Sequence, residues 1–432
     1  MRQKQRKTMA IFNSLTPSPN SLILRKLGTV ERLHWLWNQN HPNHFVMAAH
    51  VMGATTETMW RSALKQIQRR HPFLNVFLDE DDQSGPTFHL AQGCEVPLVI
   101  KERMSAGQWQ EELTRQLEIP FDETIAPLFR VVLLLEEDEC DIILTSHHAI
   151  ADGMSMVYLI RDLLQAVSGT TLDMLGTPPS QEERFASLYK TYSARASEDR
   201  VAAGPKKEKE IKLARKFGSP KVRSLRLSEL QTLTLIRKAK QEGTTVHAAV
   251  CAALTLAGRD SSPAWNDQEI RVMSMINIRK LLGNHEDCAL SVAVGIVPFE
   301  PKPSTDLWQL ARWAKEALAP SLTLESIIEL SHAVETALPE GTDAEGLSKF
   351  ASQGLKHDLV VTNVQRIPFD TNFGDIHLEA VWGPSALNEV EGVQAVALAT
   401  TNDSMCLVHT SYTPIEDLLE NAVGRLLDAC SW

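Results

Sequence analysis

The stretch Ser146-His147-His148-Ala149-Ile150-Ala151-Asp152-Gly153 is the part of the sequence from which the fold can be worked out. Two adjacent histidines are followed, after three small or apolar residues, by an aspartate and a glycine. At ordinary residue frequencies, this combination at this spacing arises by chance in about one chain per thousand of this length. The stretch therefore has the specificity of a functional motif.

The residues around the motif predict a strand, a loop and a helix. Arg130–Leu135 and Asp141–Ser146 are apolar runs joined by an acidic turn, which is typical of a β-hairpin whose second strand ends at the histidines. Beyond Gly153, apolar residues recur every three or four positions, so a helix is expected to pack on the sheet. Successive side chains of a strand point to opposite faces, so at most one of the two histidines is expected to be catalytic.

These residues resemble the HHxxxDG signature of a large acyltransferase superfamily that uses coenzyme A or a carrier protein as acyl donor. The superfamily includes condensation domains of nonribosomal peptide synthetases, alcohol O-acetyltransferases and polyketide-associated acyltransferases. The resemblance implies an α/β fold with two chloramphenicol-acetyltransferase-like lobes, mixed sheets flanked by helices, and an active-site channel between the lobes. It extends over nearly the whole chain through further segments that look like motifs of the superfamily, namely Trp60–Leu74, Pro120–Asp122, Pro127–Arg130, Asn277–Arg279 and Val360–Asn363.

Acyl transfer from a thioester needs a base that is neutral near pH 7, and histidine is the natural candidate. The resemblance implies that His148 is this base, and that no acyl-enzyme forms; the chain also lacks a GxSxG nucleophile elbow. The alternative for His148 is a core histidine satisfied by hydrogen bonds. His147 is expected to be structural.

Asp152 leaves two interpretations open. It could orient His148 as the carboxylate of a triad, but the resemblance implies that it pairs with an arginine and holds the loop, with Arg279 as the leading partner. Gly153 is expected to let the chain turn into the helix without a Cβ clash. Asn363 is a candidate donor to the oxyanion or contact to the acceptor, although a structural role at a strand end is equally open.

Two lobes separated by a charged crossover are expected. Residues 1–193 form the lobe with the motif, 194–223 the crossover and 224–432 the second lobe, whose sheet is predicted to include Ile376–Val381. The lysines of the crossover could meet the phosphates of coenzyme A, but a solvated segment is favoured. Val396–Leu427 repeats the strand, turn, strand, loop and helix of the motif region, with a tyrosine at the place of His148.

Composition narrows the class of protein. The 432 residues carry a formal charge of −11, which argues against nucleic-acid binding because phosphates require a basic surface. Six scattered cysteines without metal-binding spacing suggest a reducing compartment. The basic start lacks the apolar segment of a signal peptide, and no apolar run reaches membrane-spanning length, so a cytoplasmic protein is expected. A monomer is also expected. No metal and no tightly bound cofactor are expected.

Two departures from the superfamily pattern are visible. Asn372–Asp375 reads NFGD instead of the DFGWG of plant-type BAHD acyltransferases, so the chain is not assigned to that branch. Gln365 stands where relatives often have glycine, which leaves the shape of the local loop open.

The function predicted from these features is a stand-alone acyltransferase. It would move an acyl group from acyl-CoA or an acyl carrier protein to a small-molecule hydroxyl, or an amine. The alternatives are a catalytically idle docking module and an amide-forming condensation enzyme.

Overall fold

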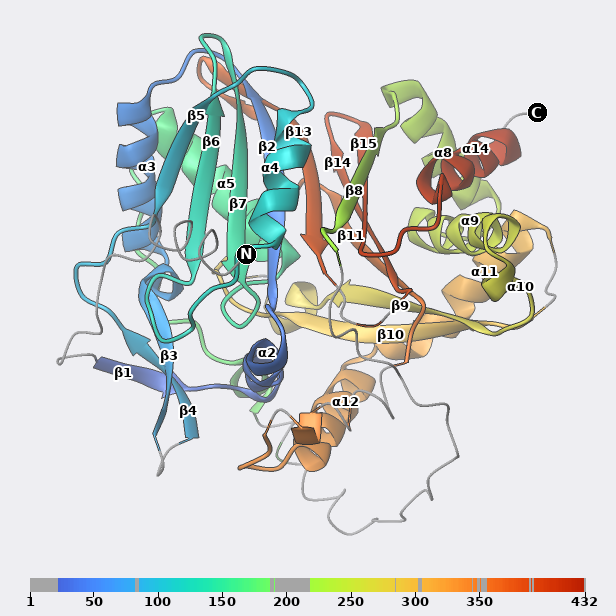
Figure 1. The fold of residues 1–432 in the computed structure, drawn as a ribbon, viewed down its shortest axis with the longest axis horizontal. Coiled ribbons are helices and arrows are strands. Elements are labelled where there is room, and N and C mark those ends of the chain that lie inside the picture. The colour runs from blue at the N-terminus through green and yellow to red at the C-terminus, as the bar shows by residue number, and fades with distance from the viewer. Residues whose placement is uncertain are drawn as a thin grey trace.

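The computed structural model describes residues 22–81, 85–186, 190, 218–283, 285–301, 305–343, 345–347, 350, 356–387, 390 and 392–430. Two six-stranded mixed sheets stand next to each other, one built mainly from the blue-to-green half of the chain and the other from the yellow-to-red half (Figure 1). The predicted two-lobed α/β fold is confirmed. Among the described residues, none of the helices combines the length and apolar character that a bilayer crossing requires.

The first lobe is organised around the strand that carries the motif. Strand β7 pairs antiparallel with β6 on one side and with β2 on the other, so the predicted hairpin is present and lies inside the sheet. Helices α3 and α5 cover one face, and α4 covers the other. The elements are β2 (His44–Met52), α3 (Glu57–Arg70), β5 (Leu98–Glu102), α4 (Gln108–Leu117), β6 (Phe129–Leu135), β7 (Glu139–His147), α5 (Gly153–Val167) and α6 (Gln181–Arg184).

A small three-stranded sheet and a helix precede and flank this lobe. Residues 22–40, which show no clear pattern in the sequence, form a strand and a helix. The helix, α2, lies close to the junction of the lobes (Figure 1). These elements are β1 (Leu22–Lys26), α2 (Thr29–Asn40), η1 (Pro72–Asn75), β3 (Val76–Asp81) and β4 (Gly85–Leu90), with strand order β1-β4-β3.

The second lobe is built around a buried helix. Residues Ala248–Arg259 of α9 are buried on every side, because the helix lies among α8, α11, α14 and the sheet. Its small alanine side chains permit this close packing. The elements are β8 (Lys221–Arg226), α8 (Glu229–Gln241), α9 (Val246–Ser261), α10 (Pro263–Asn266), β9 (Ile270–Asn277), η2 (Arg279–Leu282), β10 (Val292–Phe299), α11 (Leu307–Leu318), η3 (Ala319–Leu322), α12 (Leu324–Ala337), β11 (Leu359–Arg366), β14 (Gln394–Thr401), β15 (Ser404–Ser411) and α14 (Leu418–Cys430).

The predicted membership of one strand is wrong. Strand β13 (Ile376–Ala386) was expected to extend the second sheet, but it pairs antiparallel with β2 of the first sheet. The short strand β12 (Asn372–Phe373) pairs with the other side of β13 and forms the edge of this sheet. The physical reason lies in β2, which is buried along most of both faces and would expose a long apolar edge if nothing paired with it. The second half of the chain therefore completes the sheet of the first lobe.

The internal repeat is present as predicted. Strands β14 and β15 form an antiparallel hairpin followed by α14, as β6 and β7 are followed by α5. Most of the predicted crossover lies outside the described residues, including every lysine of that segment except Lys221. Lys221 begins β8, an edge strand that pairs with β15, so the second lobe begins before residue 224.

Candidate active site

His147 ends strand β7 and is enclosed by its surroundings. The side chain is fully buried, and its Nδ1 accepts a hydrogen bond from the backbone N–H of Ala149 at 3.1 Å. Its ring meets the edge of Phe121. Burial lowers the pKa of His147 to about 3, with a smaller contribution from the charge of His148. A neutral, enclosed imidazole that holds its own loop fits the predicted structural role.

His148 follows the end of the strand, and its side chain lines two cavities. The ring stacks on that of His34, with centroids 4.2 Å apart, and lies 4.6 Å from the ring of Phe45. Its Nδ1 is buried without a geometrically good hydrogen bond, so Nε2 is the nitrogen that remains for a ligand. Burial lowers the pKa of His148, while backbone carbonyls and Asp152 oppose that change. The imidazole is therefore neutral at pH 7, as a general base must be.

Asp152 is paired with Arg279, not with His148. Arg279 donates from Nη1 to Oδ2 of Asp152 at 2.7 Å, and both side chains are buried. The backbone N–H of Ser291 donates to the same oxygen at 2.9 Å, while Oδ1 accepts from the backbone of Ser155 and caps α5. Since both carboxylate oxygens are occupied in this way, Asp152 holds the loop and the helix N-terminus.

The arginine and the aspartate do not form a two-bond fork. The second nitrogen of Arg279, Nη2, donates instead to Ser155 Oγ and to the carbonyl of Ala289, each at 2.9 Å. Burial alone would raise the pKa of Asp152, but the charge and hydrogen bonds of Arg279, with backbone donors, keep that pKa below its ordinary value. The pair thus connects the motif loop to the segment between β9 and β10.

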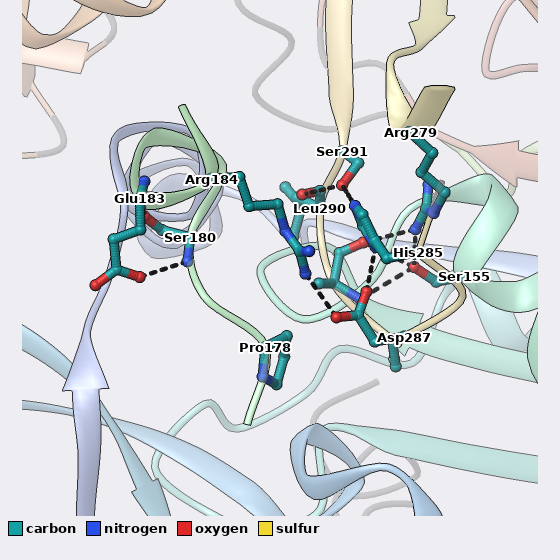
Figure 2. Close-up of polar contacts among 12 residues, drawn as sticks. Ser155, Pro178, Ser180, Glu183, Arg184, Arg279, His285, Asp287, Leu290 and Ser291 are labelled. Carbon is teal, nitrogen blue, oxygen red and sulfur yellow. Dashed lines mark hydrogen bonds and ion pairs between the residues drawn. The ribbon is translucent and has the colours of Figure 1, made fainter. Parts of the chain in front are cut away.

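A second cluster of hydrogen-bonded side chains adjoins the Asp152–Arg279 pair through Ser291. Figure 2 shows His285 between Asp287 and Ser291: its Nδ1 is bonded to Asp287, and its Nε2 lies 2.9 Å from Ser291 Oγ. Arg184 of α6 donates to the other oxygen of Asp287 at 2.6 Å. The order resembles a hydrolase triad, but Ser291 is fully buried and its hydroxyl also lies 2.8 Å from the carbonyl of Leu290. We therefore assign this cluster to holding Ser291 against Asp152.

Gly153 is needed for close packing and not for an unusual backbone angle. A Cβ at this position would lie 3.0 Å from Pro384 of β13 and 3.2 Å from Val364 of β11. The φ angle of Gly153 is not positive, so its backbone conformation is one that other residues can also adopt. The sequence prediction named the turn as the reason, whereas the structure shows that segments of the second half press against the start of α5.

Asn363 lies near the end of β11 and lines two cavities, one of which it shares with His148. Its Oδ1 accepts a hydrogen bond from the backbone N–H of Gln365 at 2.7 Å, which leaves Nδ2 as its available donor. Gln365 has φ +66°, a left-handed conformation that glycine adopts most easily. The glycine common in relatives at this position thus has a conformational reason.

Three neighbouring cavities adjoin strand β9, and two of them are lined by residues from both halves of the chain. A cavity of about 420 Å³ is lined by His34 and His148 from the first half and by β9, β10 and α12 from the second. A smaller one of about 130 Å³ contains His148, Asp152 and Asn363 in its wall. The third, of about 480 Å³, includes Asn363, Lys315 and Arg366. Met275 lines all three, so they meet around one strand.

Sequence reasoning singled out neither His34 nor the cluster around His285. Their roles depend on how α2 and the segment before β10 dock, and no spacing in the sequence signals that arrangement. Among the described residues, no group of three or more His, Cys, Asp or Glu side chains is arranged to hold a metal ion. The six cysteines are free and buried.

Two family models match consecutive parts of the chain. The one described as "Condensation domain" matches residues 31–211, and the one described as "Phthiocerol/phthiodiolone dimycocerosyl transferase C-terminus" matches residues 217–372. With the two-lobed fold, these matches indicate that the protein is an acyltransferase. The first half of the chain is thus similar to condensation domains, and much of the second half is similar to the C-terminal part of a dimycocerosyl transferase.

Solved structures share the fold over nearly the whole chain. Polyketide synthase associated protein 5 from Mycobacterium tuberculosis is similar with a TM-score of 0.66 and 17% identity, over 95% of this chain and 99% of that one. TRI3 trichothecene 15-O-acetyltransferase from Fusarium sporotrichioides gives 0.67 and 14%, over 97% and 98%. The first condensation domain of the CDA synthetase gives 0.68 and 16%, over 96% and 97%.

Curated relatives are much longer proteins. Gramicidin S synthase 2 from Brevibacillus brevis is 29% identical over 133 residues, which are 29% of this chain and 3% of the relative. Tyrocidine synthase 3 from Brevibacillus parabrevis is 33% identical over 115 residues, 26% of this chain and 2% of the relative. The chain therefore spans less than a tenth of the length of these relatives.

Proposed function

We propose that this chain is a stand-alone acyltransferase that moves an acyl group from a coenzyme A or carrier-protein thioester to a hydroxyl acceptor, with His148 as general base. The observation that carries the proposal is the position of His148. Its neutral imidazole lies where the 420 Å³ and 130 Å³ cavities meet, between walls from both lobes. A donor and an acceptor that enter from different cavities would meet at this ring.

In the proposed reaction, the acceptor attacks the thioester directly, with His148 as the only base and without an acyl-enzyme intermediate. Nε2 of His148 takes the proton of the acceptor hydroxyl as the oxygen attacks the thioester carbonyl. The carbonyl oxygen becomes an oxyanion, for which Nδ2 of Asn363 is the proposed donor. The tetrahedral intermediate then collapses, the carbon–sulfur bond breaks, and the imidazolium returns its proton to the thiolate. His148 is neutral again after each turnover.

The character of the cavities supports an assignment of the two substrates. The 480 Å³ cavity includes Lys315, Arg366 and the start of α9, which suit the phosphates of coenzyme A or a phosphopantetheine arm. The 420 Å³ cavity has mostly apolar walls, which suit an acceptor with a hydrophobic body. The bond between Arg279 and Asp152 holds the motif loop, which carries His148, in place beside the cavities. We further propose that the protein acts as a cytoplasmic monomer.

A product screen tests the function directly. The protein is incubated with a panel of acyl-CoAs and acyl carrier proteins, each combined with alcohols and amines, and the products are identified by mass spectrometry. We expect an acylated acceptor that forms with the wild type and is lost in His148→Ala. If no donor and acceptor pair gives product while the protein is folded, the catalytically idle docking module becomes the better interpretation.

The pH dependence of the reaction gives a further prediction. Burial lowers the pKa of His148 below the ordinary value of about 6.5, so the base stays neutral into mildly acidic solution. We expect the acid limb of the kcat/KM profile to have its midpoint below about pH 6.5, because kcat/KM reports the free enzyme. A midpoint above that value would contradict a buried, neutral base.

A further inference from the structure

His34 of α2 forms a second imidazole at the proposed acceptor site. Its ring lies parallel to that of His148, with an interplanar angle of 9°, and lines the 420 Å³ cavity. Nothing in the sequence motifs includes this residue, because it lies more than a hundred positions before the HHxxxDG stretch. The two rings meet because α2 docks against the end of β7.

Asn43 fixes which nitrogen of His34 carries the proton. Its Nδ2 lies 2.9 Å from the backbone carbonyl of His34 and 2.9 Å from His34 Nδ1. A carbonyl only accepts, so the amide nitrogen must face both atoms and donate one hydrogen to each. Nδ1 is then the acceptor of the ring, and Nε2 carries the hydrogen. The backbone carbonyl of Asn43 also accepts the N–H of His148 at 3.0 Å, so one residue holds both imidazoles.

The surroundings keep His34 neutral. Burial lowers the pKa of His34 well below its ordinary value, and the charges that His148 and His147 would carry lower it further. Both hydrogen-bond contacts of His34 with Asn43 use Nδ1 or the backbone. Because His34 lines the 420 Å³ cavity, Nε2–H is the donor of its ring that remains for a ligand there. In a mostly apolar cavity, a donor beside the base has the position of a ligand-binding group.

We propose that Nε2–H of His34 donates a hydrogen bond to the reacting oxygen of the acceptor and thereby selects alcohols over amines. The inference rests on the proposed function, because it assumes that His148 takes the proton of the same acceptor. An alcohol oxygen has two lone pairs, so one can accept from His34 while the other attacks the thioester. A neutral amine nitrogen has one lone pair, which cannot do both. The site thus suits hydroxyl acceptors with an apolar body, and its product is an ester.

The test compares an alcohol with the amine of the same carbon skeleton, using the best alcohol of the product screen. His34→Phe keeps a stacked ring but has no donor, and His34→Gln keeps an N–H donor on a different frame. We expect His34→Phe to lower kcat/KM for the alcohol by about ten- to a hundredfold, the usual cost of a lost hydrogen bond in a buried site. The value for the amine should change by less than about threefold, and His34→Gln should recover part of the loss. Because each variant is compared with wild type on the same substrate at the same pH, the fraction of amine that is protonated in solution does not affect the ratio.

Two results would overturn the proposal: an alcohol kcat/KM within about twofold of wild type in His34→Phe, or equal losses for alcohol and amine, which indicate a role through His148 alone. Wild type and His148→Ala are assayed in parallel. If turnover is absent or independent of His148, the proposed function fails and the inference falls with it. If His34→Phe does not fold, the ¹⁵N spectrum of the wild-type histidine rings decides: a hydrogen on Nε2 of His34 supports the proposal, and one on Nδ1 overturns it.

Discussion

His148→Ala is expected to lower turnover by about a hundredfold or more, because a positioned general base typically contributes that much. Binding of the donor should change little, since the 480 Å³ cavity that suits it does not include His148 in its wall. The loss should therefore appear in kcat and not in KM. Turnover is measured with the donor and acceptor that the product screen identifies.

A matched histidine in the second lobe separates catalysis from folding. His409 is buried in β15 and lies 2.9 Å from Gln394, but it lines none of the three cavities. His409→Ala should lower the melting temperature while turnover per folded molecule stays near wild type. His147→Ala should lose less turnover than His148→Ala. Near-wild-type turnover of folded His148→Ala would remove His148 from the mechanism.

The local structure around the motif could be predicted because each signal is short-range. Alternating and three-to-four spacing define β6, β7 and α5 from adjacent residues, and the end of β7 places the histidines. The resemblance added Arg279, which the structure brings to within 2.7 Å of Asp152. The same logic extends to the repeated hairpin and helix at the end of the chain.

The arrangement of the lobes could not be read in this way. Strand periodicity shows that β13 has one buried face, but it does not say which sheet receives it. The partner is decided by the exposed edge that β2 would otherwise have. The position of His34 beside His148 could not be predicted for a related reason. Its contact with His148 depends on the docking of α2, and the turn between α2 and β2 places Asn43 beside both rings.

The effect of Asp152→Asn distinguishes the two interpretations of this aspartate. Asparagine is nearly as good an N-cap as aspartate, so the substitution removes the charge while α5 keeps its cap. Arg279, which is 1% exposed, then has no carboxylate. Removing one partner of a buried pair costs roughly 3 to 5 kcal/mol, so the free energy of unfolding and the activity should fall together. An aspartate that only oriented His148 would leave the melting temperature nearly unchanged while turnover collapsed.

A double-variant cycle tests whether the two charges act on each other. Asp152→Asn, Arg279→Gln and the double variant are compared by thermal unfolding and kinetics, and we expect the double variant to lose less than the sum of the two single losses. The pair Arg226 and Glu379 is a control, since its atoms lie 2.8 Å apart but each side chain is 33% exposed. Arg226→Gln should cost no more than about 1 kcal/mol. Strictly additive losses for Asp152 and Arg279 would mean that their bond does not hold the motif loop, and the loop would then depend on the cap at Ser155 and on the N–H of Ser291.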